Sequence, residues 1–202
     1  MVAIFPLITI FAPLLGTLLI SLFWRDLGDR VARLGIAALW CSALTSLATL
    51  AVVLSGDTIQ LALIGTPSGT MTYTVMVDRL AAVMMALISL VSLIIHVYSE
   101  RYMVGDAGYV RFFALLGGLT CVLLSLVSSG NLFWLFVCWH LVTWLLATLL
   151  VCNPDSRAAR DAGQKTFWVQ SLGDAAFAVA LLADLVEVDL DQLVVHRAVV
   201  GA

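Results

Sequence analysis

Two ionisable side chains lie deep inside apolar runs of this sequence, and both are suited to exchanging protons. The first is His140, which lies within the largely apolar run from Phe136 to Trp144. Histidine titrates near neutral pH and its neutral form is tolerated in an apolar setting, so His140 is a candidate proton carrier. The alternative is structural: His140 joins two helices by hydrogen bonds, with Thr143 one turn away on its own helix.

The second is Asp174, which follows Gln170 by four residues. This spacing places both side chains on one face of a helix, and such a polar stripe should face protein or water rather than lipid. A carboxylate inside a membrane span is costly, which favours a proton pathway through Asp174, although it can also tie two helices together. Lys165, at the predicted cytoplasmic end of this helix, is either a further pathway residue or a lysine that extends to the lipid headgroups.

Enzyme chemistry finds no support among these residues. The sequence contains no glycine-rich phosphate loop, nucleophile elbow or metal-ligand spacing. Cys138 and His140, two residues apart on a helix, point in nearly opposite directions, and the four cysteines are interpreted as small hydrophobic residues. We therefore expect no cofactor in this chain and no enzymatic activity from it alone, although it can be a subunit of a larger transport or redox complex.

The elements that position these residues follow from composition. Of 202 residues, 62% are hydrophobic and 11% charged, against roughly 25% charged in soluble proteins. The bilayer is therefore the expected solvent, and an all-α polytopic membrane protein is the expected fold, with residues 1–202 in a single membrane domain. A net charge of −3 without a basic run excludes nucleic acid as a partner.

Hydropathy predicts about six transmembrane helices, over residues 2–24, 34–54, 80–97, 110–127, 132–151 and 166–186. Between the second and third spans, Thr-Ile-Gln-Leu and Met-Thr-Tyr-Thr-Val flank Gly65–Gly69, which predicts a short extramembrane hairpin within residues 55–77. His96, Asp78 and Arg79 are expected at the membrane interface. Four acidic residues after the sixth span predict a solvated segment: Asp184, Glu187, Asp189 and Asp191.

Orientation follows from the basic residues on alternate loops, because Lys and Arg are retained in the cytoplasm. The loops after the first, third and fifth spans carry eight of them, against Arg79 and Arg197 on the other side; the eight are Arg25, Arg30, Arg33, Arg101, Arg111, Arg157, Arg160 and Lys165. This asymmetry predicts that the N-terminus and the hairpin lie outside the cytoplasm, in a chain of the cell inner (cytoplasmic) membrane.

A motif joins the third and fourth spans, Ile95-His96-Val97-Tyr98-Ser99-Glu100-Arg101-Tyr102-Met103 followed by Gly108-Tyr109-Val110-Arg111-Phe112-Phe113-Ala114. Asp78-Arg79-Leu80 precedes it, and Asn131-Leu132, Trp139, Lys165 with Phe167, and Gly173-Asp174 continue it. Over about residues 78–191 the chain resembles the large antiporter-like subunits of respiratory complex I (NADH-quinone oxidoreductase chain 5) and of multisubunit cation/proton antiporters. The resemblance implies a proton pathway through His140, Asp174 and Lys165, supported by Gln170, Thr143 and Arg111.

Two departures from the family pattern bear on this implication. His140 stands where the family has a glutamate directly after the tryptophan, and Ser171 stands where an arginine is expected before the aspartate. Family members also carry about twice as many spans, so the chain looks like an N-terminal half.

The branch that is similar in lacking the glutamate is the DabB-type membrane subunit of inorganic-carbon uptake systems. That similarity implies a proton-conducting subunit that drives bicarbonate or CO2 uptake. Its expected partners are a large zinc-containing subunit resembling a carbonic anhydrase, a further antiporter-like membrane chain, or both. Two alternatives stay open: a proton-translocating subunit of a complex I-like oxidoreductase or antiporter, and a non-conducting membrane anchor for a partner.

Overall fold

The fold is all-α, as the sequence predicts. The computed structural model describes residues 4–56, 58–64, 73–106, 108–151 and 157–200. Within these ranges, six helices are long and apolar enough to cross a membrane. They are α1 (Ile4–Leu27), α2 (Val31–Leu54), α3 (Arg79–Tyr102), α4 (Tyr109–Val127), α5 (Leu132–Leu150) and α6 (Arg157–Val200), with a 3-10 turn, η1 (Gly28–Arg30), between the first two.

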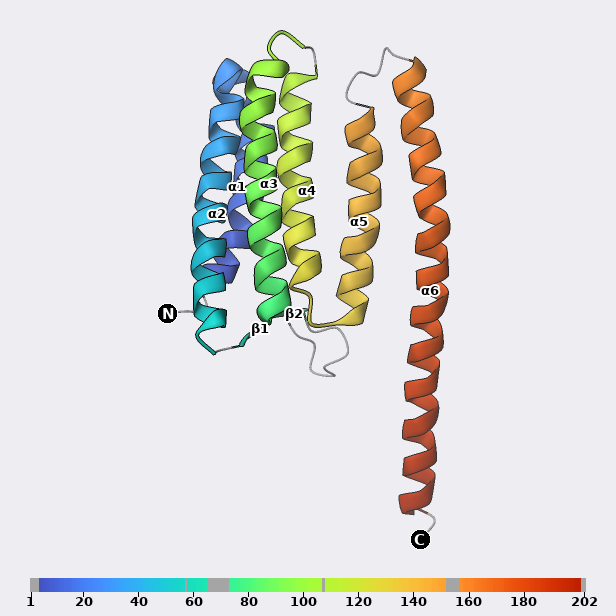
Figure 1. Ribbon diagram of the computed structural model, residues 1–202. Helices are drawn as coiled ribbons and strands as arrows, with labels where there is room; N and C mark the ends of the chain where they lie inside the picture. Colours follow the sequence, from blue (N-terminus) through green and yellow to red (C-terminus); the bar gives the residue numbers. More distant parts are fainter. Residues whose placement is uncertain (1–3, 57, 65–72, 107, 152–156, 201–202) are drawn as a thin grey trace.

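The helices form two parts: a bundle of α1 to α4, and a second part made of α5 and α6, called the wing below (Figure 1). Helices α1 to α4 pack on one another, whereas α5 packs on α4 and α6 packs mainly on α5. The most apolar stretches of α1 to α4 are 33–44% buried, but those of α5 and α6 are only 17% and 11% buried. The wing therefore presents far more of its surface to lipid or to other chains than the bundle does.

Small residues bring the bundle helices close together. A side chain added at Gly16 would begin 2.8 Å from Ala38 on the next helix, and one at Gly117 would begin 2.5 Å from the Thr17 hydroxyl. Such close approach is the usual basis of helix association in a bilayer. Lipid tails are as apolar as the helix surfaces, so the hydrophobic effect does not drive the helices together and close van der Waals packing must do so. Hydroxyl pairs add interhelical hydrogen bonds: Ser46 to Ser89 at 2.7 Å, and Ser92 to Thr120 at 2.5 Å.

The predicted hairpin is present as two antiparallel strands, β1 (Ile59–Ile64) and β2 (Tyr73–Val77); its predicted turn, Gly65–Gly69, lies outside the described residues. Strand β2 also pairs with the connection between α4 and α5. The Met76 N–H donates to the Ser128 carbonyl at 2.8 Å, and the Gly130 N–H donates to the Thr74 carbonyl at 2.9 Å. The hairpin thus holds the residues that lead directly into α5.

Several helices extend beyond their predicted ends, and α3 and α6 do so furthest. Helix α3 starts at Arg79, where the Asp78 carboxylate accepts a hydrogen bond from the Ala81 N–H at 2.7 Å, and continues to Tyr102. Helix α6 is continuous through the predicted acidic segment, because hydropathy marks where a helix leaves hydrocarbon and not where it ends.

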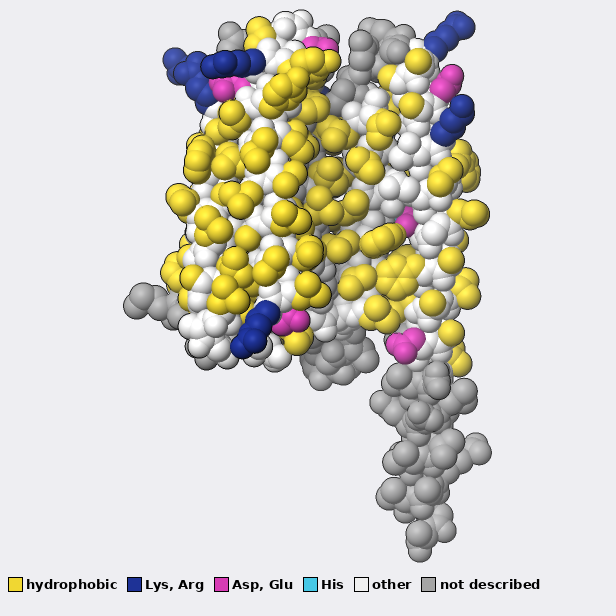
Figure 2. All heavy atoms as spheres, viewed as in Figure 1, with side chains coloured by type: hydrophobic (Ala, Val, Ile, Leu, Met, Phe, Trp, Pro, Cys, Tyr) yellow, Lys and Arg dark blue, Asp and Glu magenta, His cyan; other side chains and the backbone are white. Residues whose placement is uncertain are grey.

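Figure 2 shows Lys and Arg gathered at the end of the molecule where α2 and α6 begin, with apolar side chains between that end and the other.

Candidate functional site

The two candidate proton carriers are brought into direct contact, across α5 and α6. The Nδ1 atom of His140 lies 2.9 Å from Oδ2 of Asp174, although the residues are 34 positions apart. The side chain of His140 is 49% exposed and that of Asp174 only 6%. The pair therefore joins a half-exposed imidazole to a buried carboxylate, and when Asp174 is ionised the Nδ1–H of His140 donates to it.

The second carboxylate oxygen is held by Thr143. Its hydroxyl donates to Asp174 Oδ1 at 3.3 Å, and the threonine itself is 2% exposed. His140 and Thr143 are three residues apart, so one face of α5 presents both groups to Asp174. This contact joins three residues that the sequence analysis selected, in a hydrogen-bonded group that can hold a proton on the imidazole or on the carboxylate.

Aromatic rings lie along the same contact. Phe136 stacks on His140 with ring centroids 6.4 Å apart, and Phe177 meets Phe136 edge-on at 5.4 Å. Phe177 also contacts Trp139. Phe136 lies one helical turn before His140 on α5, and Phe177 lies about one turn after Asp174 on α6. The rings therefore form an apolar border on one side of the polar group.

Gln170 and Ser171 lie one turn before Asp174 on its face of α6. The Gln170 Oε1 and Ser171 Oγ atoms are buried and have no hydrogen-bond partner among the described residues. Gln170 therefore shares the buried face as its spacing predicts, but its Oε1 atom forms no hydrogen bond among the described residues. Both oxygens lie among the chain's own atoms rather than facing lipid, so this part of the α5–α6 contact is polar.

Lys165 and Arg111 lie away from this group. Lys165 is exposed and precedes Asp174 by nine residues of α6. Nine residues correspond to a rotation of about 180° and a rise of about 13 Å, so Lys165 lies on the opposite face of the helix. It lines a shallow depression with Asp161, Gln164, Trp168 and Val169. Arg111 is exposed in the first turn of α4. The structure thus joins neither residue to the His140–Asp174 pair.

Of the histidines whose burial the structure describes, His96 is the buried one: it is 0% exposed inside the bundle, six residues before the end of α3 at Tyr102. Its predicted level at the membrane interface stays a prediction. Its Nδ1 atom lies 2.9 Å from the Ser92 carbonyl, its ring lies 5.5 Å from that of Phe113, and its Nε2 atom has no partner among the described residues. The sequence contains one signal for this burial. Polar residues recur at helical spacing on one face of α3, and this face includes Ser89, Ser92, His96 and Ser99.

No cluster of three or more His, Cys, Asp or Glu side chains that could hold a metal ion is found among the described residues. The fold and the site together define a polytopic α-helical membrane protein in which a half-exposed histidine meets a buried aspartate between helices α5 and α6.

Comparison with known proteins narrows this class. Residues 64–113 match the family described as NADH-ubiquinone oxidoreductase (complex I), chain 5 N-terminus. The chain is 38% identical, over 83% of its length, to the probable inorganic carbon transporter subunit DabB1 of Halothiobacillus neapolitanus. It is 40% identical to the F(420)H(2) dehydrogenase subunit L of Methanosarcina mazei and 38% identical to the NAD(P)H-quinone oxidoreductase chain 5 of Picosynechococcus, each over 55% of its length.

These matches confirm the resemblance: the chain contains the N-terminal part of an antiporter-like membrane subunit of the complex I chain 5 type. It spans 30% of the length of the DabB1 relative and 17% of the other two. The DabB1 similarity also extends over more of the chain than residues 78–191.

Proposed function

We propose that this chain is a proton-conducting membrane subunit of an energy-coupled transport complex, and that the process it drives is the uptake of inorganic carbon. The observation that carries the proposal is the His140–Asp174 pair, held at 2.9 Å between a half-exposed imidazole and a buried carboxylate. Ionisable pairs of this kind inside a membrane are characteristic of proton relays. The similarity to DabB1 over 83% of the chain supports the choice of process.

The proton transfer can be written with the atoms in contact. A proton binds Nε2 of His140 from its exposed side, and the Nδ1 proton passes to Oδ2 of ionised Asp174 over the existing hydrogen bond. The imidazole returns to neutral with the other tautomer, and Asp174 becomes a neutral acid. Thr143 stays bonded to Oδ1 and fixes the carboxyl group throughout. Asp174 then releases its proton, and a flip of the imidazole ring turns the remaining Nε2–H toward the carboxylate, so that the next cycle runs with the two nitrogens exchanged.

A second candidate function is proton translocation in a complex I-like oxidoreductase or a cation/proton antiporter. It is supported by the matching family and by the two oxidoreductase relatives, each covering 55% of the chain. A third candidate is a non-conducting anchor, for which the pair is only an interhelical bond. The half-exposure of His140 favours conduction, because a purely structural pair gains from complete burial.

The sparsely buried α5 and α6 helices support a role within a complex. The expected partners are a large zinc-containing subunit resembling a carbonic anhydrase and a further antiporter-like membrane chain. The inner membrane is the proposed location, with the N-terminus outside the cytoplasm, because basic residues concentrate at the opposite end of the molecule.

Purification of the intact complex from native membranes tests the proposal. We expect a zinc-containing soluble subunit to co-purify, and vesicles containing the complex to accumulate labelled bicarbonate only while a proton gradient is maintained. Redox subunits and gradient formation on quinone reduction would instead establish the second function. A complex that assembles but moves neither protons nor inorganic carbon would identify an anchor.

A further inference from the structure

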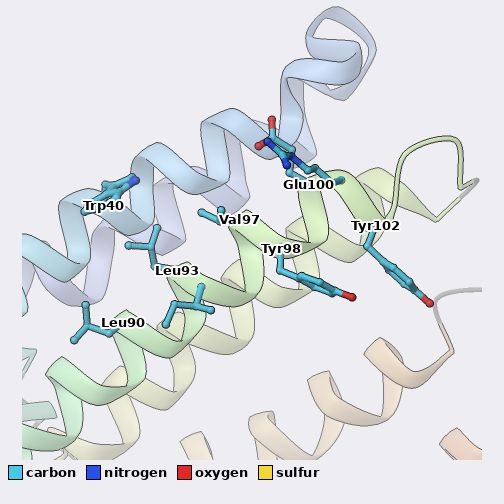
Figure 3. A pocket seen from close by; sticks show the side chains of 9 residues that line it. Trp40, Leu90, Leu93, Val97, Tyr98, Glu100 and Tyr102 are labelled. Atoms are coloured by element: carbon cyan, nitrogen blue, oxygen red, sulfur yellow. The ribbon is translucent and has the colours of Figure 1, made fainter.

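An open groove runs along the outer side of the contact between α2 and α3. Its volume is about 960 Å³, and its apolar part is lined by Trp40 of α2 and by Leu90, Leu93, Ile94 and Val97 of α3. Figure 3 shows Trp40 across from Leu90 and Leu93, with Glu100 and Tyr102 toward the other end. The groove is therefore amphipathic along its length, apolar at one end and polar at the other.

The length and position of the groove match one leaflet of a bilayer. It reaches from Leu90 to the last turn of α3 at Tyr102. Twelve residues of helix rise about 18 Å, slightly more than half of the roughly 30 Å hydrocarbon core. The apolar end thus lies near the bilayer midplane and the polar end at the headgroups, as for a single phospholipid.

The groove lining favours an acyl chain over a partner helix. None of its nine lining residues is Gly, Ala, Ser or Thr. Helix contacts in bilayers depend on small residues, and the contacts inside this chain do so at Gly16 and Gly117. Large branched and aromatic side chains leave an irregular channel that a flexible hydrocarbon chain fills more readily than a rigid helix does.

Both signs of charge line the polar end. Glu100 is half-buried and Arg101 is exposed, and the rings of Tyr98 and Tyr102 stack beside them with centroids 5.9 Å apart. Glu100 also borders a second cavity, of about 680 Å³, which Arg33 lines as well. A guanidinium binds phosphate, and a carboxylate binds a primary ammonium group. A phosphate–ammonium headgroup complements both residues together.

We propose that this groove is a binding site for one phospholipid of the phosphatidylethanolamine class. One of its two acyl chains lies along Leu93 and Trp40, its phosphate binds Arg101, and its ammonium group binds Glu100. Phosphatidylglycerol has no cation for Glu100, and the quaternary ammonium of phosphatidylcholine donates no hydrogen bond. The site is independent of the His140–Asp174 pair and of the transported species.

Lipid retention on the purified full chain tests the site by native mass spectrometry. With phosphatidylethanolamine, phosphatidylglycerol and phosphatidylcholine of matched acyl chains at equal concentration, we expect the first to be retained about two- to fivefold more, the size of one exposed ion pair. Glu100→Gln should abolish that preference, and Arg101→Gln should lower retention of all three lipids. Equal retention by the unaltered protein, or an unchanged preference in Glu100→Gln, overturns the proposal.

A groove-filling variant separates this site from general lipid association. Ile94 is 67% exposed in the groove, and Leu182, which lies on α6 away from it, is 62% exposed. Ile94→Trp should remove the retained lipid, whereas Leu182→Trp should leave both the amount and the preference unchanged. A photo-crosslinker at position 94 should capture lipid in native membranes. Capture of a polypeptide there would show that a partner helix occupies the groove instead.

Discussion

Asp174 and Lys165 lie on opposite faces of the same helix, about 13 Å apart along its axis. The buried carboxylate faces α5, where it meets His140, while the lysine faces outward in the third turn of α6. Within the described residues, Asp174 is therefore paired with a histidine, and a carboxylate–lysine pair is not formed.

Replacing Asp174 with Asn should abolish gradient-driven uptake while the complex still assembles. Asn keeps the size and hydrogen-bonding capacity of the side chain but cannot carry the proton. We expect uptake to fall by about 10²-fold or more, as for loss of a positioned proton-transfer group. Uptake and complex yield are measured in the same membranes. Asp184→Asn, at an exposed position of the same helix, is the matched control and should behave as the unaltered protein. Loss of assembly together with uptake would indicate a structural Asp174.

His140 and Asp174 should be coupled in stability. Their hydrogen bond is shared between two helices, so the effects of His140→Ala and Asp174→Ala should not add in the double variant. We expect a coupling free energy of about 0.6–1.7 kcal/mol, the range for side-chain hydrogen bonds between membrane helices. Reversible unfolding in mixed detergent micelles measures it. Additive effects would mean that the contact contributes nothing to the fold.

Lys165→Ala should leave proton conduction nearly unchanged. The ammonium group lies on the outward face of α6, away from the pair, and removing it takes no partner from Asp174. Proton flux in vesicles containing the complex provides the measurement, with Asp174→Asn as the inactive reference. A loss of flux comparable to that of the reference would place Lys165 in the pathway through contacts that another subunit supplies.

Gly163→Ala should destabilise the α5–α6 contact. An added methyl group would collide with Val151 and lie 3.1 Å from the Ala147 carbonyl. Overpacking of this kind costs about 1–3 kcal/mol. Gly173→Ala, also on α6, meets nothing within 4 Å and should be neutral or slightly stabilising, because Ala favours helix over Gly. Thermal unfolding of both variants, followed by circular dichroism, compares them directly. Equal melting temperatures would exclude the predicted collision.

The orientation prediction is tested by cysteine labelling from outside the cell. In a background without native cysteines, Ser55→Cys should react with an impermeant maleimide and Asp106→Cys should not. Both positions are exposed, and they lie at opposite ends of the bundle, after α2 and after α3 respectively. The reverse reactivity would invert the topology derived from the basic residues.

The sequence was sufficient to predict the six helices and the two strands. Apolar run length and the alternating hairpin pattern are local properties, so they are readable without tertiary information. Helix ends were less accessible: α3 continues five residues past its predicted end, because polar residues such as Glu100 prolong a helix beyond the hydrocarbon at little cost. His96 therefore lies six residues before the end of α3, at a position buried in the bundle.

The site was predictable in its residue types but not in its pairing. A rare ionisable residue in an apolar run singles out His140 and Asp174 separately. Their contact depends on the rotation and the height of α5 relative to α6. This packing geometry cannot be predicted from the local sequence between the two residues. The position of Lys165 is limited in the same way. Its helical spacing from Asp174 gives the face of α6 on which it lies, but its separation from the His140–Asp174 pair depends on where α5 packs.

The pairing of β2 with the α4–α5 connection makes α5 and α6 mechanically unequal. Axial sliding of α5 would break the hydrogen bonds from Met76 and to Thr74 just before its first turn. Helix α6 has only an 11% buried apolar stretch to resist displacement. A partner that pulls on α6 would shift it along a stationary α5. Such a force would therefore change the distance between the Asp174 carboxylate and the His140 imidazole.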